Sequence, residues 1–349
     1  TPYCLFRTDL SRTVDSKDAF IKSFIVVSFG IIINYINGSF VFIFSRSPVF
    51  YMESRYILYI HLVINDMIML SISVTLNIMI YAVPLVNVST CCVLLLVGSM
   101  THKNTPLSLA GMAVERYIAI CKPLRHSQIC TVRRTYMLII LIWTVTFIPE
   151  LADIVILFLT RPLTIFTSRM LCYPLAIYNT SYHLEKAVAV NVLFLSFVWI
   201  TLIYTYFRVF FAAKTATTDP VSAKKAQNTI LLHGVQLLFC MMSYISPLLE
   251  VILLPNDRSK ILFSNYLITN ILPRFLTPFI YGIRDQKFVS YFKMYFSVFA
   301  LYSIWYCPFI KGIFSDCEFR NERSYQITIY VYNSEKFSLM VAETVLCEE

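Results

Sequence analysis

The chain has 349 residues, of which 58% are hydrophobic and only 14% are charged, whereas a soluble domain usually carries about 25% charged residues. The net charge of +9 does not indicate nucleic-acid binding, because the basic residues cluster at the ends of apolar segments, as they do in the cytoplasmic loops of membrane proteins. Composition therefore excludes a soluble protein and predicts one surrounded by lipid.

The predicted secondary structure consists of seven apolar helices, so the expected fold class is an all-α membrane protein with a seven-transmembrane helix bundle. Only helices and closed barrels can satisfy backbone polar groups within lipid. The apolar runs are continuous over the roughly 20 residues that a helical span needs, and they lack the alternating segments of about 10 residues that build a barrel. The predicted spans cover residues 20–44, 56–81, 92–121, 135–159, 187–213, 226–254 and 262–283.

These spans divide the chain into three parts. Residues 1–19 are expected to be an extracellular segment without a signal peptide, so that the first span inserts by itself or the N-terminus is incomplete. Residues 20–298 form the membrane domain, which ends at 285–298 in a short cytoplasmic amphipathic helix of mixed basic and aromatic residues. Residues 299–349 would be a cytoplasmic tail, and three interpretations stay open: an eighth membrane-associated segment, a disordered tail, or sequence from an imperfect gene model.

The connections between spans predict the orientation in the membrane. Cytoplasmic loops are enriched in Lys and Arg, which places the connections after the third, fifth and seventh spans inside and the N-terminus outside. The first 22 residues also hold four basic side chains, which weakens this argument. The basic residues of the three connections include Lys122, Arg125, Arg133, Arg134, Lys214, Lys224, Lys225 and Arg284.

The most specific motif lies at the cytoplasmic end of the third span. An acid beside an arginine, Glu115-Arg116, forms a charge pair that can open, and the freed arginine can then dock a partner. A bare Glu-Arg-Tyr would also suit an ordinary helix end. The full run over residues 112–126, Met-Ala-Val-Glu-Arg-Tyr-Ile-Ala-Ile-Cys-Lys-Pro-Leu-Arg-His, resembles the hallmark of the odorant receptors, a family of rhodopsin-like (class A) G-protein-coupled receptors.

The resemblance extends over residues 20–296 and is greatest to the fish odorant receptors. Asn37, Asp66 and Trp143 match polar or aromatic residues of the family's first, second and fourth helices. Residues 225–229 with His233 resemble the start of its sixth helix, and residues 272–285 resemble its seventh-helix signature. Two positions depart from the family: Glu115 replaces the usual Asp, and Thr277 replaces the usual Asn.

The resemblance implies a plasma-membrane receptor with defined partners and no cofactor. A small-molecule odorant would bind between the helices, and a heterotrimeric G protein of the stimulatory olfactory type would dock at Arg116. Tyr117 belongs to the same motif, and Tyr206 and Tyr281 would support the open state. The resemblance also implies a disulfide between Cys91 and Cys172, with Cys92 as a competitor for the same role.

Two ionisable residues lie inside predicted spans, where they are costly and usually functional. Asp66 and Arg274 each lie about ten residues from a cytoplasmic helix end, which corresponds to a depth of ~15 Å. We therefore expect them to pair within an intramembrane polar network that also contains Asn37 and Thr277. The alternative is that each faces water separately.

His102 and Lys103 lie ~20 Å from Arg116 along the third helix, and the resemblance to the family implies that the ligand binds at this level. Lys103 is a candidate counter-charge for an acidic ligand, but pairing with Glu150, Asp153 or Glu250, or extension toward the membrane surface, is favoured. The full set of candidate ligand-binding residues is Ser99, His102, Lys103, Tyr244 and Tyr266.

Asn179 begins a glycosylation sequence in a predicted outer loop. Three other functions are alternatives to an odorant receptor. A transporter would need an internal repeat or helices broken by glycine and proline, and the chain has only 7 glycines and no repeat. A membrane enzyme would need a metal or nucleophile cluster, and no such spacing is present, which also predicts no metal site. A nonsensory class A receptor is the closest alternative.

Overall fold

The computed structural model describes residues 16–82, 85–172, 174–178, 180–215, 238, 263–278 and 289–292. The chain divides into two compact units, residues 1–295 and 296–349, and every described residue belongs to the first. The predictions for Asn179, Tyr244, Tyr281, the sixth span and the tail therefore lie outside the described residues. Of the predicted amphipathic helix, residues 289–292 are described, and they are helical.

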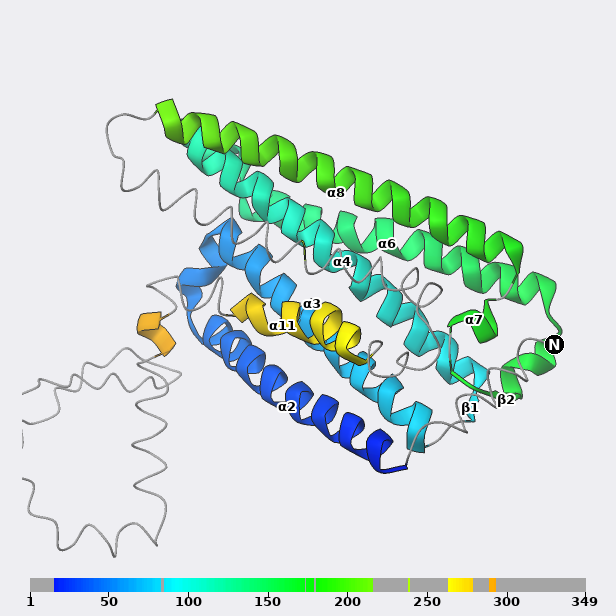
Figure 1. The fold of residues 1–349 in the computed structure, drawn as a ribbon. Coiled ribbons are helices and arrows are strands. Elements are labelled where there is room, and N and C mark those ends of the chain that lie inside the picture. Colours follow the sequence, from blue (N-terminus) through cyan, green and yellow to red (C-terminus); the bar gives the residue numbers. More distant parts are fainter. Residues whose placement is uncertain are drawn as a thin grey trace, which may run out of the picture. The chain divides into compact units, whose positions relative to one another are not determined.

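Five long helices account for the first five predicted spans (Figure 1). Helices α2, α3, α6 and α8 are long and apolar enough to cross a membrane. Helix α4 has 34 residues, or roughly 50 Å of helix, and carries a polar stretch, Thr101–Asn104, in its middle. The long helices are α2 (Ser16–Arg46), α3 (Ser54–Ala82), α4 (Val88–Cys121), α6 (Val132–Thr160) and α8 (Ser181–Thr215).

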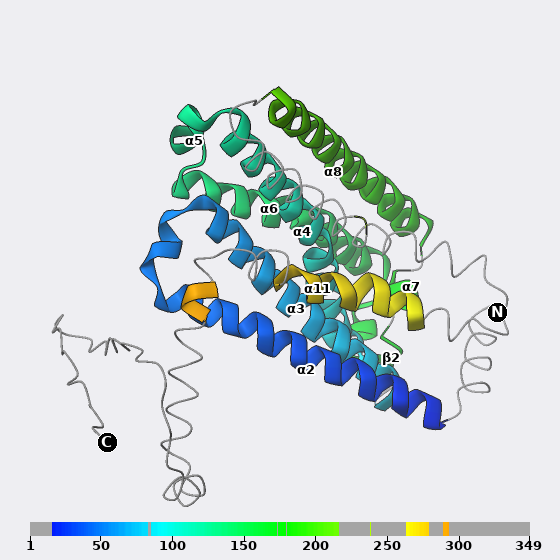
Figure 2. The same ribbon diagram turned by 60° about the vertical axis from the view of Figure 1, so that its left-hand side comes forward.

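The described part of the seventh span combines two kinds of helix. The π-helix η3 (Leu267–Ile271) leads directly into α11 (Leu272–Thr277). Both lie beside α3, and Figures 1 and 2 show α11 next to α2 and α3. Proline at position 273 lacks the N–H that an α-helix would donate to the carbonyl of Thr269, so this carbonyl must find another donor.

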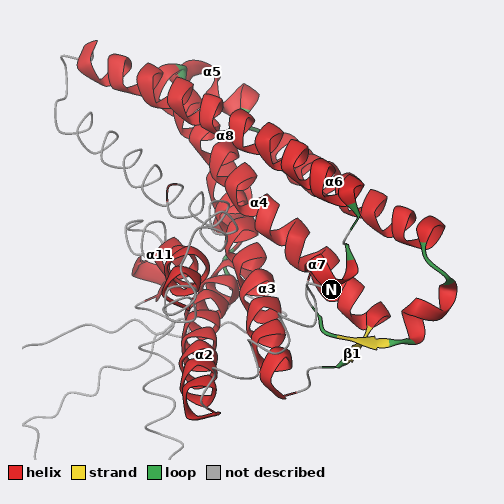
Figure 3. Ribbon diagram, turned by 45° about the vertical axis from the view of Figure 1, so that its right-hand side comes forward, coloured by secondary structure: helices red, strands yellow, loops and turns green. Residues whose placement is uncertain are grey.

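Short elements connect the long helices. Among the described residues the only strands are β1 (Val86–Asn87) and β2 (Arg169–Met170), which pair antiparallel at the start of α4 (Figure 3). Helix α5 (Pro123–Ile129) follows α4 at its opposite end. The remaining short elements are η1 (Pro48–Met52), η2 (Leu163–Thr167) and α7 (Pro174–Ile177).

Helix α4 is the centre of the bundle, since it contacts α3, α6 and α8. Polar side chains join these helices inside the apolar core. His61 of α3 accepts from Trp143 Nε1 of α6 at 2.9 Å and lies 3.3 Å from Ser108 Oγ of α4. Thr146 Oγ1 of α6 donates to Asn104 Oδ1 of α4 at 2.7 Å.

The outer faces of the bundle are apolar. Large hydrophobic side chains such as Ile31, Leu159, Leu193 and Ile200 are more than half exposed on α2, α6 and α8. Monomeric soluble proteins rarely expose contiguous apolar surface of this extent. The flanks of the bundle therefore suit a lipid environment, as the sequence predicts.

Candidate functional site

The two ends of the bundle differ chemically, and each is named here by its residues. The disulfide end carries Cys91 at the start of α4, bonded to Cys172 after β2 with 5.5 Å between the Cα atoms. The Arg116 end carries the Glu115-Arg116 pair near the end of α4 together with α5. The disulfide confirms the predicted pairing, and Cys92 is a buried free thiol.

At the Arg116 end, Glu115 is held by two partners. Its carboxylate is only 6% exposed, and its Oε2 lies 3.7 Å from Arg116 Nε. Its other oxygen, Oε1, lies 3.1 Å from His126 Nε2. His126 belongs to α5, so this contact fixes the short helix against the end of α4. The sequence motif contained His126 but did not reveal this contact.

Cys130 lies at the end of α5, close to the contact between Glu115 and His126. Burial and, secondarily, the negative charge of Glu115 raise the pKa of the Cys130 thiol, while Arg134 opposes them. Cys130 is therefore a neutral and weakly nucleophilic thiol at neutral pH, and its reactivity reports on the charge of Glu115.

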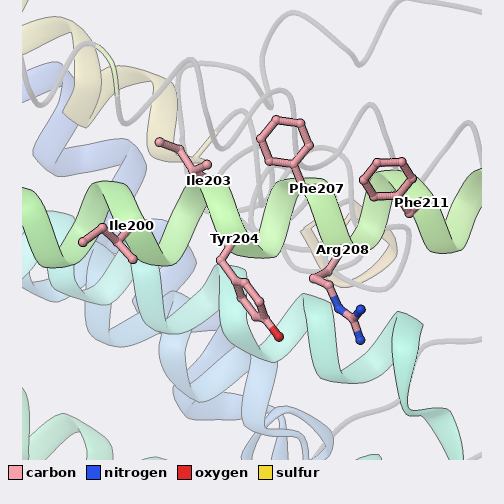
Figure 4. Close-up of a pocket in the computed structure, with 6 residues that line it drawn as sticks. All are labelled: Ile200, Ile203, Tyr204, Phe207, Arg208 and Phe211. Atoms are coloured by element: carbon pink, nitrogen blue, oxygen red, sulfur yellow. The ribbon is translucent and has the colours of Figure 1, made fainter.

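Tyr117 contacts α8 through Tyr204, with ring centroids 5.9 Å apart. Figure 4 shows Tyr204 and Arg208 pointing from α8 toward α4. Tyr206, the residue that the sequence suggested as a support for the open state, is 41% exposed and packs on Phe207 and Phe210 of its own helix. Tyr204 rather than Tyr206 touches the motif in this structure.

A groove lies along the same half of α8 (Figure 4). The lining residues that the structure describes all come from this one helix, and most of them are apolar. The groove is near the Arg116 end rather than at the level predicted for the ligand. Its lining residues are Ile200, Ile203, Tyr204, Phe207, Arg208 and Phe211.

A polar network lies between the two ends of the bundle and is centred on Asp66. Thr105 Oγ1 donates to Asp66 Oδ1 at 3.1 Å, and Thr277 Oγ1 donates to Asp66 Oδ2 at 2.8 Å. Asn65 joins the network by donating to Thr105 Oγ1 at 3.0 Å. Asn37 is also fully buried, but its side-chain amide has no hydrogen-bond partner in the part of the chain that the structure describes.

The expected direct pairing of Asp66 with Arg274 is not observed. Among the described ion pairs none joins the two residues, although Arg274 is near enough to act electrostatically on the carboxylate. Arg274 Nη1 donates to the Thr269 carbonyl at 2.9 Å instead. The reason is local: Pro273 leaves that carbonyl without its helical donor, and the guanidinium takes the vacant place.

Toward the disulfide end, Lys103 forms an ion pair with Glu150 of α6. Ser99 Oγ also donates to Glu150 Oε1, at 2.8 Å, and accepts from Lys103 Nζ at 3.3 Å. The two ions are 12% and 9% exposed. The structure therefore places Lys103 in the interhelical pair that the sequence favoured over a ligand contact.

A second charge cluster joins α6 to α8. Lys186 forms an ion pair with Asp153, whose Oδ1 also lies 2.7 Å from His183 Nδ1. Both clusters join α6 to a neighbouring helix. The carboxylates of Glu150 and Asp153 are thus each engaged by a basic side chain.

His102 and Tyr266 are the other described members of the predicted ligand set. Tyr266 of the seventh span shares a hydrogen bond of 2.6 Å with Ser73 of α3. The charge of Arg274 acts electrostatically on both His102 and Tyr266. Within the described residues, no group of three His, Cys, Asp or Glu side chains is arranged to hold a metal ion.

Comparisons with known proteins agree with this arrangement. Residues 36–333 match the family described as "7 transmembrane receptor (rhodopsin family)". The chain is 30% identical over 296 residues to "Odorant receptor 131-2" of Danio rerio, which covers 83% of this chain and 89% of that protein. It is also 28% identical over 154 residues to "Probable G-protein coupled receptor 21" of Mus musculus, covering 43% and 44% of the two chains.

Proposed function

Because the chain belongs to the rhodopsin family of seven-transmembrane receptors, we propose that it is an odorant receptor. Family membership confirms the predicted resemblance and makes the chain a multi-pass membrane receptor rather than an enzyme or a transporter. It also implies a ligand and a G protein as partners. That the ligand is an odorant is supported by the similarity to the zebrafish odorant receptor over most of both chains.

The receptor would lie in the plasma membrane with its disulfide end outside the cell. Disulfides persist in oxidising compartments, which favours an extracellular position for Cys91 and Cys172. The basic residues around α5, including Lys122, Arg125 and Arg134, suit the cytoplasmic side. The N-terminus and Asn179, the proposed glycosylation site, would then be extracellular.

The single observation that carries the proposed mechanism is the double contact of Glu115 with Arg116 and His126. A charge pair at a helix end, shared by two basic groups, is an element that can open. An odorant bound near the disulfide end would favour the open arrangement by binding it better. Arg116 would then leave Glu115 and contact the G protein, with Tyr281 supporting the open arrangement.

A cell assay with a cyclic AMP reporter tests this proposal. The full chain is expressed and exposed to a panel of odorants, and at least one odorant is expected to raise cyclic AMP. The response should disappear in Arg116→Ala while surface expression persists. A response that survives in Arg116→Ala would contradict the proposed switch, and a chain that responds to none of the odorants would contradict its proposed role as an odorant receptor.

The nonsensory receptor remains the second candidate. It is favoured by the similarity to the mouse G-protein coupled receptor, which covers less than half of either chain. Expression confined to a nonsensory tissue, together with silence toward the odorant panel, would favour it over an odorant receptor.

A further inference from the structure

Arg274 is a buried cation that forms no direct ion pair with any residue the structure describes. Arg274 lies within the seventh span and is 2% exposed, and its Nε has no hydrogen-bond partner among the residues that the structure describes. Within the described part of the chain, the guanidinium donates to one neutral acceptor, the carbonyl of Thr269. An ionised side chain inside a membrane span is costly unless it pairs, and it usually marks a functional site.

Each of the three carboxylates that the structure describes inside the bundle has contacts other than Arg274. Glu150 is paired with Lys103, and Asp153 is paired with Lys186. The two oxygens of Asp66 accept hydrogen bonds from Thr105 and Thr277. Asp66 therefore attracts Arg274 electrostatically without forming the fork-shaped contact that an arginine makes with a carboxylate.

The guanidinium is oriented toward the disulfide end. Thr269, whose carbonyl it caps, comes five residues earlier in a helix that runs from the disulfide end to the Arg116 end, so the side chain reaches back by several ångströms. Its charge acts on His102 and Tyr266, both predicted to line the ligand site. Asp66, bonded to Thr105 and Thr277, lies at the level of the following turns toward the Arg116 end.

We propose that Arg274 binds the carboxylate of an acidic, otherwise apolar ligand that enters from the disulfide end. This inference rests on the proposed function and names its ligand class. The guanidinium is planar and always charged, and it matches a carboxylate with two parallel hydrogen bonds. Arg274 takes the role of counter-charge that the sequence offered for Lys103, which Glu150 neutralises. Asp66 attracts the guanidinium from the opposite side without contacting it.

The probes are short linear carboxylic acids, each with the matching methyl ester. Acids should be preferred by the wild-type receptor in the cyclic AMP assay. In Arg274→Met the potency of the acids should fall by a factor on the order of 100, as expected when one partner of a buried charge pair is removed, while the esters change little. Arg274→Lys keeps the positive charge but cannot form two parallel hydrogen bonds with a carboxylate, so the potency of the acids should lie between the values for wild type and Arg274→Met.

Two further variants keep the outcome decisive. Arg274→Met combined with Asp66→Asn removes both buried charges, so that the receptor folds even where the single variant does not. It should also lose the preference for acids. Lys103→Met combined with Glu150→Gln is the matched control, because it removes the neighbouring buried pair, and it should keep the preference. An acid preference that persists in the Arg274→Met, Asp66→Asn variant, or disappears in the control, overturns the proposal.

A binding measurement separates this inference from the proposed function. The wild-type receptor in detergent should be stabilised against thermal unfolding more by an acid than by its ester at the same concentration, since a ligand that binds the folded state more tightly raises the unfolding temperature further. The Arg274→Met, Asp66→Asn variant should show no such difference. A receptor that signals to neutral odorants but is not stabilised by acids refutes the acid site and leaves the odorant receptor intact. Stabilisation by acids without any cyclic AMP response supports the acid site and contradicts the proposed signalling function.

Discussion

His126 and Glu115 are in direct contact, with 3.1 Å between Nε2 and Oε1, although α5 only begins after α4 has ended. The same carboxylate lies 3.7 Å from Arg116. Glu115 thus links the arginine of the proposed switch to the short helix that follows it. A G protein that displaces α5 would at the same time remove one of the two groups that hold Glu115.

Replacing His126 by alanine is expected to raise signalling in the absence of ligand. The contact is partly exposed, so its net worth is about 1 kcal/mol, and losing it changes the ratio of active to inactive receptor roughly fivefold. Basal cyclic AMP, normalised to the amount of receptor at the cell surface, measures this change. Gln128→Ala, at an exposed position of the same short helix, is the control and should leave basal cyclic AMP unchanged. A fall in basal cyclic AMP with His126→Ala would contradict the proposal that the contact of His126 with Glu115 favours the inactive receptor.

Cys130 should react slowly with iodoacetamide at neutral pH, because only the thiolate is nucleophilic. Burial and then Glu115 raise the pKa of this thiol, so the rate should climb only as the pH exceeds the ordinary thiol range. Glu115→Gln removes the negative charge, lowers the pKa and should accelerate the reaction. Mass spectrometry of the peptide containing Cys130 gives the rate, and Cys130→Ser identifies the signal. Equal rates in wild type and Glu115→Gln would mean that the carboxylate does not act on this thiol.

The sequence predicted the features that depend on local pattern. Five spans and the proximity of Glu115 to Arg116 agree with the structure. The Cys91–Cys172 disulfide also agrees, but it joins residues 81 positions apart and was implied by the family resemblance rather than by local pattern. Apolar length alone defines a span, and residues adjacent in one helix need no tertiary information. Membership in the rhodopsin family was predictable because its motifs are read directly from the chain.

Features that depend on the relative rotation of helices were not predictable. The choice between Tyr204 and Tyr206 requires knowing which side of α8 meets α4. Side chains two positions apart in a helix point in directions that differ by about 200° around the helix axis. Because α8 is apolar on every side, its pattern gives no indication of that side. The direction of Arg274 likewise could not be predicted, because its Nη1 donates to the Thr269 carbonyl and this contact depends on the local geometry of the helix around Pro273.

Lys103→Met is expected to destabilise the receptor more than the removal of both partners. The pair with Glu150 is nearly buried, so a single substitution leaves an unpaired carboxylate and costs roughly 3–5 kcal/mol. Lys103→Met with Glu150→Gln leaves no charge and should restore most of that loss. Thermal unfolding of the detergent-solubilised variants provides the comparison. A double variant that is less stable than Lys103→Met alone would show that the charges are not coupled.

Opening the disulfide should reduce the amount of folded receptor at the cell surface. The bond closes a loop between residues that are 81 positions apart, and removing a native disulfide typically costs about 2–5 kcal/mol. Cys91→Ser and Cys172→Ser should therefore lower surface expression to the same extent, and the double variant should be no worse than either. Cys92→Ala is the matched control, because Cys92 is adjacent, buried and unbonded, and its expression should stay near that of the wild type. Surface labelling of intact cells measures all four variants. If Cys92→Ala lowered surface expression as much as Cys91→Ser, Cys92 would take part in disulfide formation during folding.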